Sequence, residues 1–193
     1  MTGVILFRAQ PFHDGHMHMI ENGVNYCNNG TINSLHIFIG SADKYGTERN
    51  PLPIAIRMDL IVQSLKRRFS QYNLNLIKVH PLEDLQDESN NTYSWGDYLH
   101  GKIKAATGEE EYFFFYSGDE NIPNSWFSPE IRSKIHMINL PRHRNITATS
   151  VRTAIQNADR DTLIESLPSY VYENLDTIRP YILNAEKWRT AND

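Results

Sequence analysis

Cysteine is nearly absent from this chain, since Cys27 is the one thiol in 193 residues. A single thiol excludes an internal disulfide framework and any zinc site built from several cysteines. The chain also lacks a large excess of either charge, because 19 basic and 23 acidic residues leave a net charge of −4. With no basic block, the chain is not expected to bind nucleic acid non-specifically.

Long apolar runs are missing as well. No apolar stretch approaches the ~20 residues that a bilayer-spanning helix needs, and the first residues lack the basic and apolar regions of a secretory signal. We therefore expect a cytoplasmic protein with no membrane partner. Because no repeat, low-complexity tract or linker interrupts the sequence, we expect one domain over 1–193, with an α/β core over 1–157 and a helical C-terminal segment over 158–193.

Short apolar runs alternate with segments of helical periodicity. The predicted strands are residues 4–7, 35–40, 74–79, 112–116 and 135–140. The predicted helices are residues 17–26, 54–69, 93–107, 150–157, 161–167 and 169 to about 188. This alternation predicts an α/β fold, a Rossmann-like parallel five-stranded sheet with helices on both faces and a helical C-terminal end. Ligands of such sheets bind beyond the carboxyl ends of the strands, where strand order reverses.

The most informative motif follows the first predicted strand, where the chain reads RAQPFHDGH. His13 and His16 flank Gly15 at the point where a strand leads into a helix. The unpaired N–H groups and positive dipole end of a helix N-terminus favour phosphate there, and imidazole donors can stabilise the charge that develops when a triphosphate is cleaved. Pro11 fixes the chain ahead of the helix, and Gly15 leaves room for a phosphate. We interpret His18, further along the helix, as structural.

A second motif, ITATSVR, follows the fifth predicted strand and opens a helix. Thr147, Thr149 and Ser150 can each cap that helix, and an ordinary N-cap is the alternative to a binding role. Arg152 suits phosphate because its planar fork donates two parallel hydrogen bonds. Two helix N-termini from opposite ends of the chain can thus converge on one triphosphate.

Three further segments follow predicted strands or open helices. Ser41 ends the second strand, and a polar loop carries Arg49 and Asn50. Trp95 opens a helix after the Asn90-Asn91 pair, and a Ser117-Gly118 turn ends the fourth strand. The alternatives are a solvated loop charge for the arginine, a core anchor for the tryptophan and a plain turn for the Ser-Gly pair.

Together these motifs resemble a known family. HxGH after a first strand is similar to the signature of the nucleotidylyltransferase superfamily, and RxQPFHxGH resembles archaeal-type nicotinamide mononucleotide adenylyltransferases. The TATSVR, GSA…RNP and Ser-Gly-Asp segments resemble motifs of the same family in the same order. Two positions differ, since the family commonly has glycine where this chain has Phe7 and phenylalanine where it has Ala9.

The resemblance implies transfer of AMP from ATP to nicotinamide mononucleotide (NMN), forming NAD and pyrophosphate by in-line attack. It implies catalytic roles for His13, His16 and Arg152. It implies ATP contacts by Arg8, Gln10, Gly15, Ser117, Gly118, Thr147, Thr149 and Arg152. It implies acceptor contacts by Ser41, Arg49, Asn50, Asn91 and Trp95, with the indole stacked on the pyridinium. Mg²⁺ is expected with ATP, held by phosphates and water rather than by protein ligands.

Two alternatives stay open. One is an enzyme of the same superfamily with another acceptor, pantetheine phosphate or flavin mononucleotide, or with CTP as the donor. The other is a non-catalytic nucleotide-sensing domain. In the favoured interpretation the partners are small nucleotides, with no nucleic acid and no membrane, and the chain forms a homo-oligomer.

Overall fold

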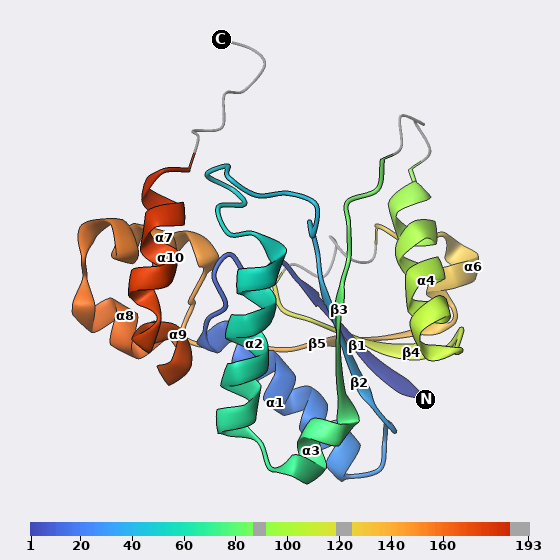
Figure 1. The fold of residues 1–193 in the computed structure, drawn as a ribbon. Coiled ribbons are helices and arrows are strands. Elements are labelled where there is room, and N and C mark those ends of the chain that lie inside the picture. The colour runs from blue at the N-terminus through green and yellow to red at the C-terminus, as the bar shows by residue number, and fades with distance from the viewer. Residues whose placement is uncertain (87–91, 119–124, 186–193) are drawn as a thin grey trace.

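The computed structural model describes residues 1–86, 92–118 and 125–185. Its centre is a five-stranded, wholly parallel sheet in the order β3-β2-β1-β4-β5 (Figure 1). The strands are β1 (Thr2–Phe7), β2 (Leu35–Ile39), β3 (Ile77–Pro81), β4 (Tyr112–Tyr116) and β5 (Ile135–Asn139). The predicted Rossmann-like fold is confirmed, and strand order reverses between β1 and β4.

The central strands are apolar on both faces because helices cover both sides of a parallel sheet. Every residue of β2 is buried. Successive side chains of a strand alternate between faces, so Ile37 and Ile39 join one hydrophobic cluster while Phe38 joins another. In β4, Phe115 and Phe114 divide in the same way.

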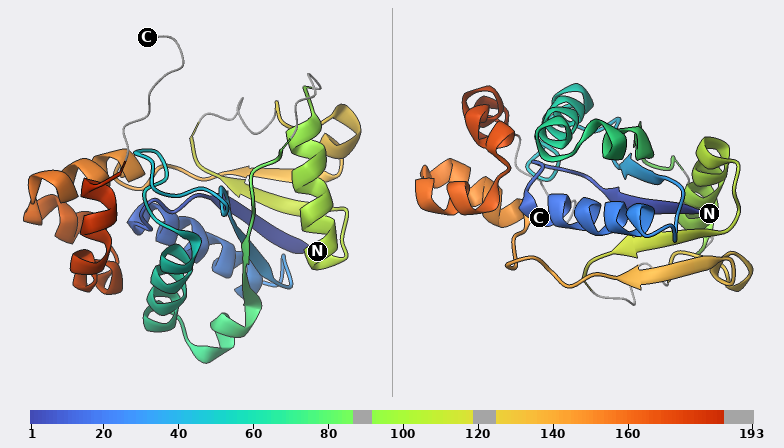
Figure 2. Two further views of the ribbon diagram at one scale, coloured as in Figure 1. Left: turned by 45° about the horizontal axis from the view of Figure 1, so that its top comes forward. Right: turned by 90° about the horizontal axis from the view of Figure 1, so that it is seen from below.

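The two faces carry different helices. α1 (Asp14–Asn28), α2 (Ile54–Arg68) and α3 (Gln71–Leu76) lie on the face of the larger cluster. α4 (Ser94–Thr107) and the short α6 (Pro129–Arg132) lie on the other. The views in Figure 2 show α4 across the sheet from α1 and α2.

The C-terminal helices extend the first face. They are α7 (Ala148–Asn157), α8 (Arg160–Ser166), α9 (Ser169–Glu173) and α10 (Leu175–Leu183). α9 packs on α2, and α10 packs on α7. Their buried residues, Val151 and Ile178 among them, belong to the larger cluster. α7 is therefore held firmly beside the end of β1.

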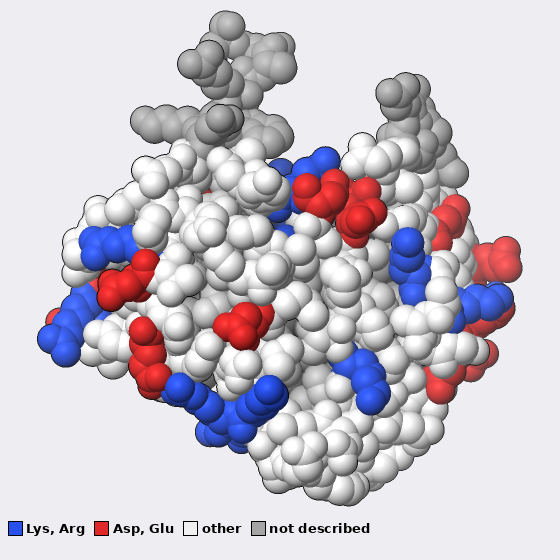
Figure 3. Space-filling view, viewed as in Figure 1, with Lys and Arg blue, Asp and Glu red and all other residues white. Residues whose placement is uncertain are grey.

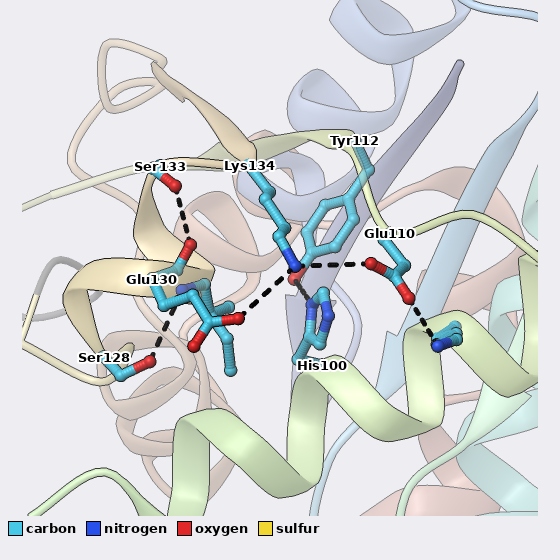
Figure 4. A network of polar contacts seen from close by, with 9 residues as sticks. His100, Glu110, Tyr112, Ser128, Glu130, Ser133 and Lys134 are labelled. Carbon is cyan, nitrogen blue, oxygen red and sulfur yellow. Dashed lines mark hydrogen bonds and ion pairs between the residues drawn. The ribbon is translucent and has the colours of Figure 1, made fainter.

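Polar contacts link α4, β4 and α6 near the amino ends of the strands (Figure 4). Lys134 pairs with Glu110 at 3.3 Å and with Glu130 at 3.7 Å. His100 of α4 and the Tyr112 hydroxyl of β4 lie 3.3 Å apart. These ion pairs are largely open to solvent, so they contribute little to stability.

Several predicted boundaries differ from the structure by two or three residues, and two of the differences have a clear local cause. The third strand begins at Ile77 instead of residue 74, because the Ser70 hydroxyl accepts the Asn73 N–H and starts α3. The predicted last helix divides at Asn174, whose side-chain amide donates to the Tyr170 carbonyl at 2.8 Å. α10 ends at Leu183, and the rest of that predicted helix from residue 186 lies outside the described residues.

Candidate functional site

Three adjoining hollows lie at the carboxyl edge of the sheet. The indole cavity, about 670 Å³, lies past the ends of β1 and β2 and is walled by Trp95 and Trp126. The turn cavity, about 370 Å³, lies past β1 and β4 and is lined by Ser117. The arginine cavity, about 330 Å³, is lined by Arg8 and Arg152. Their position is the point of strand reversal, where such folds bind ligands.

The hollows share walls. Phe7 lines the indole and turn cavities, and Arg8 lines the indole and arginine cavities. His13 and His16 line both the turn cavity and the arginine cavity. The arginine cavity is thus the common centre between two larger compartments.

Both histidines take part in starting α1. The Gly15 N–H donates to His13 Nδ1 at 3.1 Å, and the His13 N–H donates to His16 Nδ1 at 3.3 Å, a reciprocal N-terminal cap. A ring nitrogen that accepts a hydrogen bond carries no proton, so each neutral ring has its proton on Nε2. Each histidine therefore offers an Nε2–H donor.

Burial keeps both rings neutral. It lowers the pKa of His13 to about 4, and it lowers the pKa of His16 well below the usual value, with the neighbouring His13 adding to the effect. The rings stack with centroids 3.7 Å apart, where two positive charges would repel. At neutral pH the pair therefore acts as two neutral hydrogen-bond donors.

Gly15 has a steric role in this cap. A Cβ at Gly15 would lie 2.9 Å from the His13 ring, closer than real contacts allow. The sequence suggested that the missing side chain of Gly15 leaves room for a phosphate. The structure shows that it also leaves room for the His13 ring. Phe7, where the family commonly has glycine, lies 4.3 Å from the His16 ring centroid to centroid. It therefore supports the ring that it borders.

Arg8, Arg49 and Arg152 all line the arginine cavity. Burial lowers the pKa of Arg8, and the positive charges of Arg49 and Arg152 lower it further. None of the three forms an ion pair with another described residue. Three guanidinium groups without a paired carboxylate make a strong attraction for a polyanion.

The start of α7 borders the same centre. Thr147 is its N-cap, since Thr147 Oγ1 accepts the Ser150 N–H at 3.0 Å and Ser150 Oγ accepts the Thr147 N–H at 3.1 Å. The capping alternative for Thr147 is thus confirmed, while Thr147 also lines the turn cavity. Thr149 lines the arginine cavity, where its hydroxyl accepts from Arg152 Nη2 at 3.3 Å.

Gln10 forms hydrogen bonds through both its side chain and its backbone carbonyl. Its side chain donates to the Leu52 carbonyl at 3.1 Å and accepts the Leu52 N–H at 2.8 Å. Its own carbonyl accepts from Arg152 Nη1 at 2.8 Å. Gln10 therefore orients Arg152 as well as lining the arginine cavity, and direct contact of Gln10 with ATP stays a prediction.

The indole cavity collects the predicted acceptor residues Ser41, Arg49, Asn50 and Trp95. Trp95 is half-buried on the first turn of α4 and also packs against the smaller hydrophobic cluster, so it serves both as a wall and as a packing residue. Asn91 lies outside the described residues. On the other side of β1, Ser117 lines the turn cavity, and Gly118 adopts a φ of +122° facing Arg142.

Arg57 is a residue that sequence reasoning missed. It is fully buried and donates to the carbonyls of Arg8 at 2.9 Å, Gly40 at 2.8 Å and Ser41 at 2.8 Å. It thus joins the chain segments that leave β1 and β2. The available signal was a charged residue on the apolar stripe of a predicted helix, four residues before Ile61.

Other missed residues line the cavities, most of them from loops or from elements far along the chain. They are Met19, Asp43, Lys44, Tyr45, Asp84, Trp126, Arg142 and His143. Within the described part of the chain, no group of three or more His, Cys, Asp or Glu side chains is placed to hold a metal ion. In the same residues no helix has the length and apolarity needed to cross a membrane.

Comparison with known proteins finds similar curated proteins and solved structures, although no family model matches the chain. A nicotinamide-nucleotide adenylyltransferase of Methanococcus aeolicus is 33% identical over 86 residues, which cover 45% of this chain and 44% of the relative. One of Halorubrum lacusprofundi is 32% identical over 90 residues, covering 46% and 45%. The matched part therefore spans less than half the length of these curated relatives.

Among solved structures, a bifunctional NMN adenylyltransferase/ADP ribose pyrophosphatase from Francisella tularensis, complexed with AMP and a Mn ion, is similar. Its TM-score is 0.70 at 19% identity, with 94% of this chain and 51% of that chain covered. At this identity the likeness shows the shared fold. Together the matches confirm the resemblance that the motifs indicated, to nucleotidylyltransferases of the archaeal nicotinamide mononucleotide type.

Proposed function

We propose that this protein transfers AMP from ATP to NMN, forming NAD and pyrophosphate. The observation that carries the proposal is the arrangement of the three hollows. Two compartments of nucleotide size open onto one centre that combines two imidazole donors with three guanidinium groups. An enzyme that joins two nucleotides through their phosphates needs such a shared centre.

ATP fits the turn and arginine cavities. We place the adenosine against the Ser117-Gly118 turn, which follows β4, and the triphosphate beside His13, His16 and Arg152. The N-termini of α1 and α7 both border this path, and helix N-termini favour phosphate. Thr149 and Gln10 hold Arg152 in place from two sides.

NMN fits the indole cavity. Its phosphate lies toward Arg8 and Arg49, which line the indole and arginine cavities alike. Its pyridinium ring lies against Trp95, because a cation on an indole face is a favourable pair. Ser41 and Asn50 complete the predicted acceptor contacts in this cavity.

The reaction needs positioning and charge stabilisation more than acid–base catalysis. A phosphate oxygen of NMN, already ionised at neutral pH, attacks the α-phosphorus of ATP in line. The new O–P bond forms as the bond to the β-phosphate bridging oxygen breaks, and pyrophosphate leaves with the electron pair. His13 and His16 donate Nε2–H bonds to the charge that develops, and Arg152 holds the leaving group.

Mg²⁺ belongs to the proposal as part of the Mg·ATP substrate, where it would neutralise phosphate charge without requiring a side-chain ligand. The proposal also includes a single-domain, cytoplasmic homo-oligomer whose partners are small nucleotides. None of the steps given to the side chains above depends on a protein ligand to the metal.

The test is a screen of the purified chain with ATP and Mg²⁺ against NMN, nicotinic acid mononucleotide, pantetheine phosphate and flavin mononucleotide. Pyrophosphate release is measured, and the dinucleotide product is identified by mass. We expect turnover with a pyridine mononucleotide. CTP in place of ATP tests the donor, and release with pantetheine phosphate or flavin mononucleotide alone would contradict the proposal.

The matched control is His136→Ala, which removes a histidine from the exposed side of β5. We expect it to leave turnover unchanged. If ATP binds in calorimetry but no acceptor yields pyrophosphate, the chain is a nucleotide-binding domain without this activity.

A further inference from the structure

The charges of the indole cavity are divided between its two ends. Arg8 and Arg49 line the end that adjoins the arginine cavity. Asp43 and Asp84 also line the indole cavity, but they do not line the arginine cavity. Figure 3 shows acidic and basic surface next to each other at this edge of the molecule, between α2 and α4. Lys44 likewise lines only the indole cavity, so the end away from the shared centre carries two carboxylates against one ammonium and is net negative, while Arg8 and Arg49 make the end toward the centre basic.

The two carboxylates are held by defined contacts. Asp84 Oδ1 accepts from the Ser41 hydroxyl at 2.9 Å, and the Asp84 N–H donates to Asp43 Oδ1 at 2.9 Å. The other oxygen of Asp43 pairs with Lys44 at 2.9 Å. The hydrogen bond from the Asp84 backbone is the largest cause of a lowered Asp43 pKa, so this carboxyl is ionised at neutral pH.

The acidic field reaches the indole wall. The Tyr98 ring lies 5.7 Å from the Trp95 ring, centroid to centroid. Burial raises the Tyr98 pKa, and the negative charges of Glu83, Asp43 and Asp84 raise it further. A group beside Trp95 therefore experiences the negative charge of these carboxylates, whereas Arg8 experiences positive charge from Arg49 and Arg152 that the negative charge of Asp84 offsets only in part.

We propose that Asp43 and Asp84 make the indole cavity selective for the nicotinamide mononucleotide over the nicotinic acid mononucleotide. The inference rests on the proposed function. NMN has an anionic phosphate at one end and a cationic ring with a neutral carboxamide at the other, which matches the two ends of the cavity. The acid form places a carboxylate beside two carboxylates.

The experiment measures kcat/KM for both mononucleotides in the wild-type chain, Asp84→Asn and Asp43→Asn. Each asparagine keeps an acceptor oxygen and removes one negative charge. For each variant we expect the ratio of kcat/KM for the acid form to kcat/KM for the amide form to rise roughly tenfold, which corresponds to about 1.4 kcal/mol. Asp43→Asn also releases Lys44 from its ion pair, so its shift should be the larger.

Two further variants separate selectivity from general damage. Asp97→Asn removes an exposed carboxylate of α4 that does not line the cavity, and it should leave the ratio unchanged. Ser41→Ala breaks the hydrogen bond to Asp84 but keeps the charge, so it should alter KM for both acceptors alike.

The outcomes are distinguishable. If the wild-type chain releases pyrophosphate with neither mononucleotide, the proposed function fails and this inference fails with it. If both are used and neither Asp43→Asn nor Asp84→Asn moves the ratio, the selectivity assignment is wrong while the function stands. An equal shift in Asp97→Asn, or a wild-type preference for the acid form, would also overturn the assignment. Calorimetric binding of both mononucleotides gives a readout independent of turnover.

Discussion

The two edges of the sheet handle charge in opposite ways. Near the amino ends, Lys134 pairs with Glu110 and Glu130 in partly exposed contacts (Figure 4). At the carboxyl ends, the half-buried Arg8 and Arg152 approach each other with no ion pair to another described residue. Natural proteins tolerate like charges placed close together without partners mainly where function requires them. The difference favours the carboxyl edge as the candidate site, independently of any motif.

The imidazole donor at His16 should give the largest effect. His16→Asn keeps a side-chain oxygen able to accept the His13 N–H but removes the Nε2–H donor. We expect kcat to fall by roughly 10²–10³, as for loss of one donor to developing charge, with little change in melting temperature. His16→Gln, whose amide nitrogen reaches the former Nε2 position, should recover part of the rate. Wild-type kcat in the folded Asn variant would contradict the role of this ring.

Arg57 should dominate stability at the carboxyl edge. Arg57→Met fills a similar volume but leaves the carbonyls of Arg8, Gly40 and Ser41 without their donor. Buried unpaired groups cost about 1–3 kcal/mol each, so we expect the free energy of unfolding to fall by about 3 kcal/mol or more in urea titrations. Arg57→Lys keeps the positive charge but makes fewer hydrogen bonds, so its free energy of unfolding should lie between those of the wild-type chain and Arg57→Met. A loss under about 1 kcal/mol would show that the strand ends hold without it.

Acid should weaken the carboxyl edge through His13. Its pKa is about 4 in the folded chain and near 6.5 when unfolded, so the unfolded chain takes up the proton first as pH falls. The stabilisation is complete above pH 6.5 and is lost between pH 6.5 and pH 4. A shift of this size corresponds to about 3 kcal/mol.

His13→Asn provides the comparison for this pH dependence. Asparagine is a good N-cap that does not titrate, so unfolding free energies measured from pH 7.5 to pH 4 should decline less steeply in the variant than in the wild-type chain. Parallel curves would mean that the His13 ring is not buried in the neutral form.

Trp95 tests whether the indole wall binds or only packs. Stacking on an aromatic ring is worth ~1–3 kcal/mol, so Trp95→Ala should raise KM for NMN about tenfold or more and leave KM for ATP nearly unchanged. A tryptophan that only packs would instead cost about 3–5 kcal/mol of stability on truncation and affect both substrates alike. Thermal melting with both Michaelis constants distinguishes the two results.

Sequence alone predicted the elements whose signals are local. The strands and most helices follow from apolar periodicity, and the motif at His13 and His16 led to the helix start that borders two of the cavities. The third strand was misplaced because the Ser70 cap converts residues 71–76 to helix. Trp126 and Asp84 were missed because they reach the cavity through loops whose path depends on long-range packing.

The histidine tautomers are a second feature that the sequence alone could not predict. Spacing places His13 and His16 on one turn, but it does not show that each Nδ1 accepts a backbone N–H. That contact requires the cap geometry around Gly15, where a Cβ would meet the His13 ring. The residues of a site can thus be read from a motif, while their protonation is fixed by packing.

The amino edge should give the smallest effect. Lys134→Ala removes both of its ion pairs, to Glu110 and Glu130, yet these groups stay solvated and screened by salt. We expect the melting temperature to change by less than about 2 °C and kcat for AMP transfer to stay at the wild-type level. Raising the salt concentration should shrink even that change. A destabilisation as large as that of Arg57→Met would mean that the surface ion pairs at this edge stabilise the fold as much as the buried Arg57 hydrogen bonds do at the other edge. The contrast in charge between the two edges would then no longer point to function at one and stability at the other.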